Sequence, residues 1–171
     1  MKNKSVVIIL LFIWMTISNA RILDSQSVID SDSTFRPYLI AIVVVNVENT
    51  AAWYKDKLNF DIIRKMEFPE YDSLKIIHMK FGEVELELIQ KKTSFTIKKY
   101  VPDYNGFANA PLQGIAKIAF YIHDVNTLAN KLKSMDVKFL VKPYDDKDFG
   151  VRSFIIEDID GNVLQFNQRL K

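Results

Sequence analysis

The chain has 171 residues, 23 of them basic and 21 acidic, and 49% of its residues are hydrophobic, as in one ordinary globular domain. It contains no cysteine, which excludes disulfides, thiolate catalysis, and zinc or iron–sulfur sites held by cysteine. Only two histidines are present, so a histidine-rich metal site is excluded as well.

Residues 1–20 have the pattern of an export signal. Two lysines precede an apolar run, Val6–Met15, and the small residues Ser18 and Ala20 precede the expected cleavage point. The run is shorter than the roughly 20 apolar residues of a membrane span, and a retained anchor is the alternative. We therefore expect an exported protein, periplasmic or extracellular, that touches a membrane only through this segment. Without its two lysines the basic and acidic residues are equal in number, so charge gives no support for nucleic-acid binding.

An internal repeat organises the rest of the chain. Residues 21–35 are rich in Ser and Asp and are expected to be a flexible linker. Residues 36–171 are expected to form one domain with two similar halves, 36–90 and 114–169, joined by a long connector.

Each half begins with a strand-like run, 37–45 or 114–123, that ends at a helix-capping residue. The caps are Asn46 and Asp124, at an offset of 78 positions, and hydrophobic residues at helical spacing follow each one. Three strand candidates follow each helix. They are residues 60–67, 74–81 and 83–90 in the first half and 137–141, 151–157 and 162–167 in the second. Both halves therefore have the predicted order strand–helix–strand–strand–strand.

Two motifs carry a family resemblance. Ala51-Ala52-Trp53-Tyr54 with Leu58-Asn59-Phe60 forms the first, and Phe149–Phe154 leading to Asp158-Ile159-Asp160-Gly161-Asn162 forms the second. In this order they resemble the vicinal oxygen chelate superfamily of glyoxalases, bleomycin-resistance proteins and extradiol dioxygenases. Asn59 stands where that family usually has glycine, and Ile159 where it usually has proline. The resemblance implies an α+β fold, in which tandem βαβββ modules form a cup-shaped mixed sheet with helices outside.

Strand alternation separates two faces of the predicted sheets. One face is wholly apolar and suits packing against the helices; its residues are Ile40, Ile42, Val44, Leu86, Leu88, Ile118, Phe120, Leu164 and Phe166. The opposite face mixes small, polar and aromatic side chains, as a ligand-binding concavity does. Its candidate ligand-binding residues are Leu39, Glu85, Glu87, Lys117, Tyr121, Gln165 and Asn167. The alternative is that these polar residues face water on a one-sided sheet.

The resemblance also implies four metal-ligand positions, which fall on Leu39, Glu87, Lys117 and Gln165 in this chain. Leu39 has no donor atom, and the ammonium of Lys117 repels a cation. Glu87 and Gln165 alone are too few for a tight divalent site. We therefore predict no metal and no other cofactor. We expect Lys117 to take the place of the metal and to pair with Glu87, with Gln165 hydrogen-bonded to one of them.

Other side chains give weaker signals. His78 and His123 lack an evident nucleophile, and we interpret both as structural. Tyr100, Tyr104 and Phe107 lie in the connector, where they either close over a ligand or pack on the surface.

Two function classes follow. The first is a metal-free protein that binds a small molecule, as in the bleomycin-resistance branch of the family. The alternative is a metal-dependent lyase, isomerase or dioxygenase, or a metal-free enzyme with Glu87 as base and Lys117 as electrostatic stabiliser. A structural module with a filled cup is a third reading. Whether the chain is an enzyme is left open. A homodimer is left open as well, and the reason to consider one is that family members commonly pair.

Overall fold

The computed structural model describes residues 39–102 and 114–171. The expected export signal and linker, residues 1–35, lie outside this part of the chain. Within it, no helix is long and apolar enough to cross a membrane.

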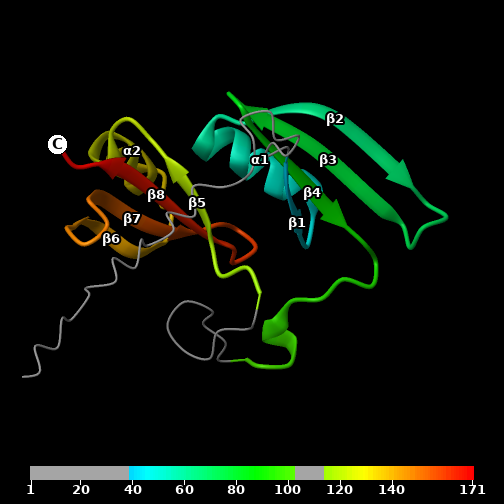
Figure 1. Ribbon diagram of the computed structural model, residues 1–171. Coiled ribbons are helices and arrows are strands. Elements are labelled where there is room, and N and C mark those ends of the chain that lie inside the picture. Colours follow the sequence, from blue (N-terminus) through cyan, green and yellow to red (C-terminus); the bar gives the residue numbers. More distant parts are fainter. Residues whose placement is uncertain (1–38, 103–113) are drawn as a thin grey trace, which may run out of the picture. The chain divides into compact units, whose positions relative to one another are not determined.

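The described residues form two halves with the same order of elements (Figure 1). The first half contains strand β1 (Ile40–Val43), helix α1 (Val47–Leu58) and strands β2 (Asp61–Phe68), β3 (Leu74–Phe81) and β4 (Val84–Gln90). The second contains strand β5 (Ile118–Tyr121), helix α2 (Val125–Ser134) and strands β6 (Phe139–Asp146), β7 (Val151–Glu157) and β8 (Val163–Arg169). A short 3₁₀ helix, η1 (Ile97–Lys99), lies in the connector.

Each half is a mixed four-stranded sheet. The strand orders are β1-β4-β3-β2 and β5-β8-β7-β6, with β1 parallel to β4, β5 parallel to β8, and antiparallel neighbours elsewhere. The register repeats as well, because Ala41 lies opposite Glu87 and Ala119 lies opposite Gln165, 78 positions further on. The predicted α+β class and the tandem βαβββ order are thus confirmed.

The predicted helix caps are confirmed too. Asn46 and Asp124 have extended backbones, and each side chain accepts a hydrogen bond from the amide three residues later, at 2.9 and 3.0 Å. At its other end α1 closes on Asn59, whose φ of 60° lies in the left-handed region. Asparagine tolerates this conformation better than most residues with a side chain, so it can replace the glycine that the family usually has there.

A glutamine from the last strand of each half supplements these caps. The Gln90 side-chain oxygen accepts from the Val47 amide at 2.9 Å, and the Gln168 oxygen accepts from the Val125 amide at 3.0 Å. The first residue of each helix is thereby tied to the sheet on which the helix packs.

The predicted apolar face forms the hydrophobic core. Val44, Leu86, Leu88, Leu164 and Phe166 are buried, and the other predicted members pack against them. Residues of both helices complete the same cluster, which therefore spans both halves.

Three strands differ clearly from their predicted length. Strand β1 is shorter, because among the described residues of the predicted run 37–45 only 40–43 pair with β4. Strand β5 is shorter, because only residues 118–121 pair with β8. Strand β6 continues through Pro143 to Asp146, with register shifts along its pairing with β7. It lies at a sheet edge, where proline is tolerated since one side needs no ladder hydrogen bonds.

The turn between β7 and β8 fastens the second half to α1. The Tyr54 hydroxyl donates to Asp158 Oδ2 at 2.9 Å, and the Thr50 hydroxyl donates to Asp160 Oδ2 at 2.6 Å. The Val45 amide donates to Asp160 Oδ1 at 2.8 Å. Burial raises the pKa of Asp158, and burial together with the nearby Asp158 charge raises the pKa of Tyr54 well above its usual value.

Glycine is required within this turn. Gly161 has a φ of +91°, and a Cβ there would lie 3.2 Å from the Glu157 Oε1 atom. Its neighbour Asn162 donates to Asp158 through its backbone amide and its side chain, at 2.8 and 2.9 Å. The second motif of the family resemblance therefore builds a contact between the halves.

Tyr54→Phe should lower the free energy of unfolding by about 1.5–3 kcal/mol, because it deletes a buried hydrogen bond to a charged acceptor. Urea unfolding followed by circular dichroism measures the change. Tyr71→Phe, at a side chain that is 64% exposed, is the matched control and should change stability by less than about 0.5 kcal/mol. Equal effects of the two substitutions would contradict the role given to Tyr54.

Gln90→Ala and Gln168→Ala should each destabilise the domain by about 1–3 kcal/mol, because each leaves a buried helix amide without its acceptor. Gln168→Glu keeps an acceptor at a helix N-terminus, where negative charge is favourable, and should retain stability. Thermal unfolding measures all three. A loss in Gln168→Glu as large as in Gln168→Ala would show that packing matters there, not the hydrogen bond.

Candidate functional site

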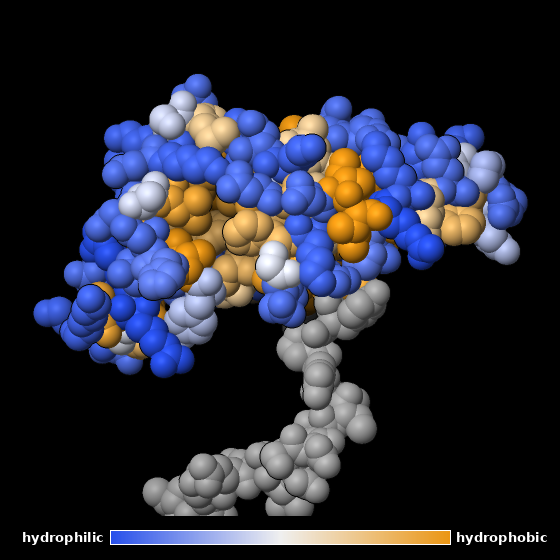
Figure 2. Space-filling model, turned by 90° about the horizontal axis from the view of Figure 1, so that it is seen from above, coloured by the Kyte–Doolittle hydropathy of each residue, from blue (hydrophilic) through white to orange (hydrophobic). Residues whose placement is uncertain are grey.

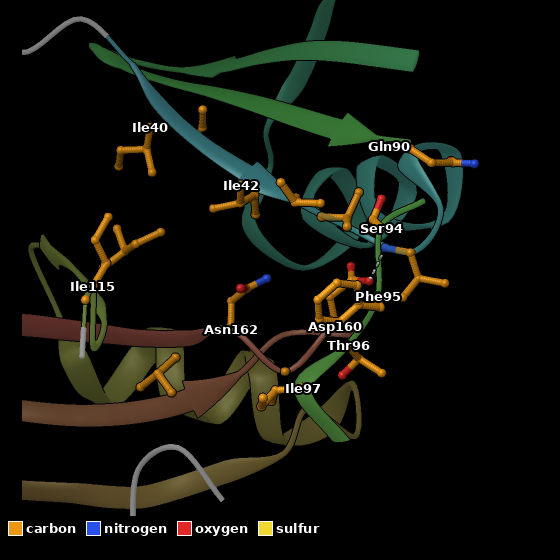
Figure 3. A pocket seen from close by; sticks show the side chains of 18 of the residues that line it. Ile40, Ile42, Gln90, Ser94, Phe95, Thr96, Ile97, Ile115, Asp160 and Asn162 are labelled. Atoms are coloured by element: carbon orange, nitrogen blue, oxygen red, sulfur yellow. Dashed lines mark hydrogen bonds between the residues drawn. The ribbon is translucent and has the colours of Figure 1, made fainter. Parts of the chain in front are cut away.

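A cavity of about 820 Å³ lies where four chain segments meet (Figure 3). They are β1 with the two residues after it (40–45), the start of the connector (90–99, in part), the residues leading into β5 (114–118), and the turn before β8 (160–163). The segments come from both halves and from the connector, so the cavity exists only in the folded domain.

The free edges of both sheets contribute to this cavity. Strands β1 and β5 each stand at the end of their sheet order. Because the Val44 amide donates to the Ile89 carbonyl on β4, the backbone groups of Ala41 and Val43 point the other way, toward the cavity. These groups are donors and acceptors that a ligand can use.

Several large apolar side chains of the lining are exposed. Val43 is 58% exposed, Val45 72%, Phe95 63% and Ile115 88%. In Figure 3, Ile42 and Ile115 extend into the cavity from opposite sides. Figure 2 shows that hydrophobic side chains also gather in patches on the face seen from above, within a hydrophilic surround. Exposed apolar surface that lines a hollow is typical of a binding site.

Lys117 is the one predicted ligand-binding residue that lines the cavity. Leu39 is half-buried just before β1, and Glu85 and Glu87 lie half-buried on β4. The other three, on β5 and β8, lie on the mixed face of the second sheet. Six of the seven predicted residues therefore lie outside the lining of this cavity.

The mixed face of the second sheet carries an aromatic and several polar groups. Tyr121 is 67% exposed, with the Arg169 guanidinium 5.5 Å from its ring centre. Gln165 donates to the Ser153 hydroxyl at 2.9 Å. The Asn167 side-chain oxygen is buried and has no hydrogen-bond partner among the described residues. A donor supplied by a ligand or by water would satisfy it.

The predicted ion pair between Lys117 and Glu87 is not formed. Among the described residues neither side chain takes part in an ion pair, and Gln165 bonds to Ser153 instead. Lys117 is exposed and precedes β5, whereas Glu87 lies inside the other sheet with β1 on its outer side. Pairing would require the ammonium to give up its hydration, and in this fold it keeps that hydration.

A different charged cluster occupies the mixed face of the first sheet. The Lys80 ammonium lies 2.9 Å from Glu85 Oε1, and His78 Nε2 lies 3.1 Å from Glu85 Oε2. The Lys80 hydrogen bond in particular holds the pKa of Glu85 below its usual value, so this carboxylate is ionised at neutral pH. The signal for this cluster was the hairpin register, which places Lys80 opposite Glu85 and His78 opposite Glu87.

The connector residues of the cavity were not singled out by strand alternation. Phe95 and Tyr100 pack edge to face with ring centres 5.0 Å apart, and Tyr100 is 60% exposed. Tyr104 and Phe107, which were considered with Tyr100, lie outside the described residues. Phe95 lies in a segment without strand or helix periodicity, so alternation could not identify it. Ile115 lies in the predicted run 114–123, but strand β5 begins only at Ile118, so alternation did not place its side chain.

The four positions that the family resemblance assigns to metal ligands offer few donor atoms in this chain. Leu39 offers no donor atom, Lys117 is a cation, and the remaining two positions carry one carboxylate and one amide. Among the residues that the structure describes, no group of three or more His, Asp or Glu could hold a metal ion. The four positions do not fit a divalent cation.

Comparison with known proteins identifies the family to which this architecture corresponds. Residues 38–166 match the family model of the Glyoxalase/Bleomycin resistance protein/Dioxygenase superfamily. The uncharacterized protein YraH of Bacillus subtilis is 25% identical over 138 residues, which cover 77% of this chain and 96% of that protein.

Solved structures with the same fold include a glyoxalase family protein from Enterococcus faecalis, with a TM-score of 0.66, 19% identity, and coverage of 78% of this chain and 98% of that one. TnmS3, an antibiotic binding protein from Streptomyces sp. CB03234, has a TM-score of 0.54 and 18% identity, with coverage of 79% and 96%. The repeated βαβββ halves and the family match over most of the chain lead to one conclusion: this protein belongs to the Glyoxalase/Bleomycin resistance protein/Dioxygenase superfamily.

Proposed function

We propose that this chain binds a small molecule in the cavity between its two halves and does so without a metal. The observation that carries the proposal is the cavity of about 820 Å³ with Val43, Val45, Phe95 and Ile115 exposed in its lining. Covering such side chains stabilises a complex by roughly 25 cal/mol for each Å² of apolar surface removed from water. The antibiotic binding protein TnmS3 shares the fold, which supports the proposal.

The metal-free part of the proposal is supported by the chemistry of the four family positions. Leu39 and Lys117 remove two of the four ligands, and no nearby cluster of carboxylates or imidazoles in the described residues replaces them. The alternative, a metal-dependent lyase, isomerase or dioxygenase of the same superfamily, needs ligands beyond Glu87 and Gln165.

Two further parts of the proposal concern location and assembly. The basic start and apolar run of residues 1–20 support export to the periplasm or the extracellular space. A homodimer is kept as part of the proposal because family members commonly pair. Sequencing of the N-terminus and measurement of the mass in solution test these two parts separately.

Ile115→Glu should weaken binding of the neutral apolar dye N-phenyl-1-naphthylamine by about tenfold or more, because it places a charge in the apolar lining. Fluorescence titration measures the affinity. Ile159→Glu is the matched control, since Ile159 is 56% exposed and does not line the cavity. Thermal unfolding verifies that both variants fold. Dye binding that is equal in the two variants, or absent from the wild type, would refute the assigned cavity.

Elemental analysis of the purified protein should find less than stoichiometric zinc, nickel, manganese and iron. Added metal should leave the unfolding temperature unchanged, because a ligand stabilises only the state that binds it. One equivalent of retained metal, lost in Glu87→Ala, would favour the metal-dependent alternative.

A further inference from the structure

The charges around the cavity are strongly one-sided. Four lysines line it, Lys91, Lys92, Lys99 and Lys117, and Asp160 is the only acidic residue of the described lining. The whole chain, by contrast, has nearly equal numbers of basic and acidic residues, 23 and 21. The excess of positive charge is therefore a local property of this cavity.

The single carboxylate of the lining does not neutralise these lysines by direct contact. Asp160 accepts from the Thr50 hydroxyl at 2.6 Å and from the Val45 amide at 2.8 Å, so each of its oxygens already has a protein donor. These bonds hold Asp160 in the contact between the halves. Its charge still offsets one of the four at a distance, which leaves the lining with a net positive charge.

Two of the lysines face a second carboxylate, and two do not. Lys91 and Lys92 help to lower the pKa of Asp72, after the larger effect of its hydrogen bonds with Thr93. Lys99 lies 5.6 Å from the centre of the Tyr100 ring, and in the described part of the chain Lys117 has no ion-pair partner. Lys99 and Lys117 therefore carry the uncompensated part of the charge.

The lining combines charge with apolar surface. All four lysines are exposed, and such side chains lay an apolar stem along a surface while the ammonium stays in water. The apolar side chains Val43, Phe95 and Ile115 line the same cavity. A molecule that matches this lining carries both an anionic group and an apolar body.

We propose that the cavity selects anionic amphiphiles, in which a carboxylate, phosphate or sulfate group is joined to an apolar body. This inference rests on the proposed function and narrows the class of ligand. The lysines attract the anionic group and repel cations, while the apolar lining supplies affinity that does not depend on charge. Specificity then comes from the difference between charged and neutral molecules of the same length.

The test compares three molecules with the same ten-carbon chain, namely decanoate, 1-decanol and decyltrimethylammonium, all below their aggregation limits. Each competes with N-phenyl-1-naphthylamine at low salt. Decanoate should bind about threefold or more tighter than decanol, and the cation should bind more weakly than either. Raising the ionic strength should reduce the difference because salt screens exposed charges.

The double variant Lys99→Gln with Lys117→Gln should bring decanoate close to the affinity of decanol and leave decanol unchanged. The control, Lys55→Gln with Lys147→Gln, removes the same charge at exposed positions outside the lining and should preserve the preference. Decyl sulfate and decyl phosphate distinguish the head groups, and tighter binding of either supports the proposal equally.

Equal binding of decanoate and decanol to the wild type would overturn this inference and leave the proposed cavity intact. A preference that survives in the Lys99 and Lys117 variant would overturn it as well. If neither the dye nor any ten-carbon molecule binds, the proposed function fails together with it. The two failures are therefore distinguishable.

Discussion

Two carboxylates in one turn hold this domain together. Asp158 and Asp160, which precede β8, receive the hydroxyls of Tyr54 and Thr50 from α1. Asp158 is buried, and its desolvation is offset by donors from Tyr54 and Asn162 and from the turn backbone. Because Asp160 also binds the amide of Val45, the end of β1 is brought to the turn of the other half. The cavity lies at this junction, so its lining depends on these hydrogen bonds.

The repeat explains why the cavity has its mixed character. Each half ends its sheet on a short strand, β1 or β5, that pairs on one side only. The core side chains of these strands pack against the helices, whereas their free edges and their opposite faces stay accessible. Backbone groups and exposed apolar side chains therefore meet in one place. The connector adds Phe95 and three lysines to the lining, which gives the cavity a chemistry that neither half has alone.

Membership of the superfamily does not determine what this chain binds, because that depends on which residues stand at the family's ligand positions. A leucine and a lysine stand at two of the four positions that the family resemblance assigns to metal ligands. The lysine remains hydrated at the cavity instead of forming an internal ion pair with Glu87. Its charge is therefore available to a ligand, together with that of Lys99. The same substitution that removes a metal ligand thus adds a positive charge to the cavity.

The sequence by itself determined the repeat, the helix caps at Asn46 and Asp124, and the division of each strand into an apolar and a mixed face. These features follow from local periodicity and from the hydrogen bonds of neighbouring residues, which any correct fold must preserve. Only the tertiary structure decided that Lys117 and Glu87 remain apart and that Phe95 and Ile115 line the cavity. Those contacts depend on how two sheet edges and an aperiodic connector are arranged relative to one another. Alternation along a single strand carries no information about that arrangement.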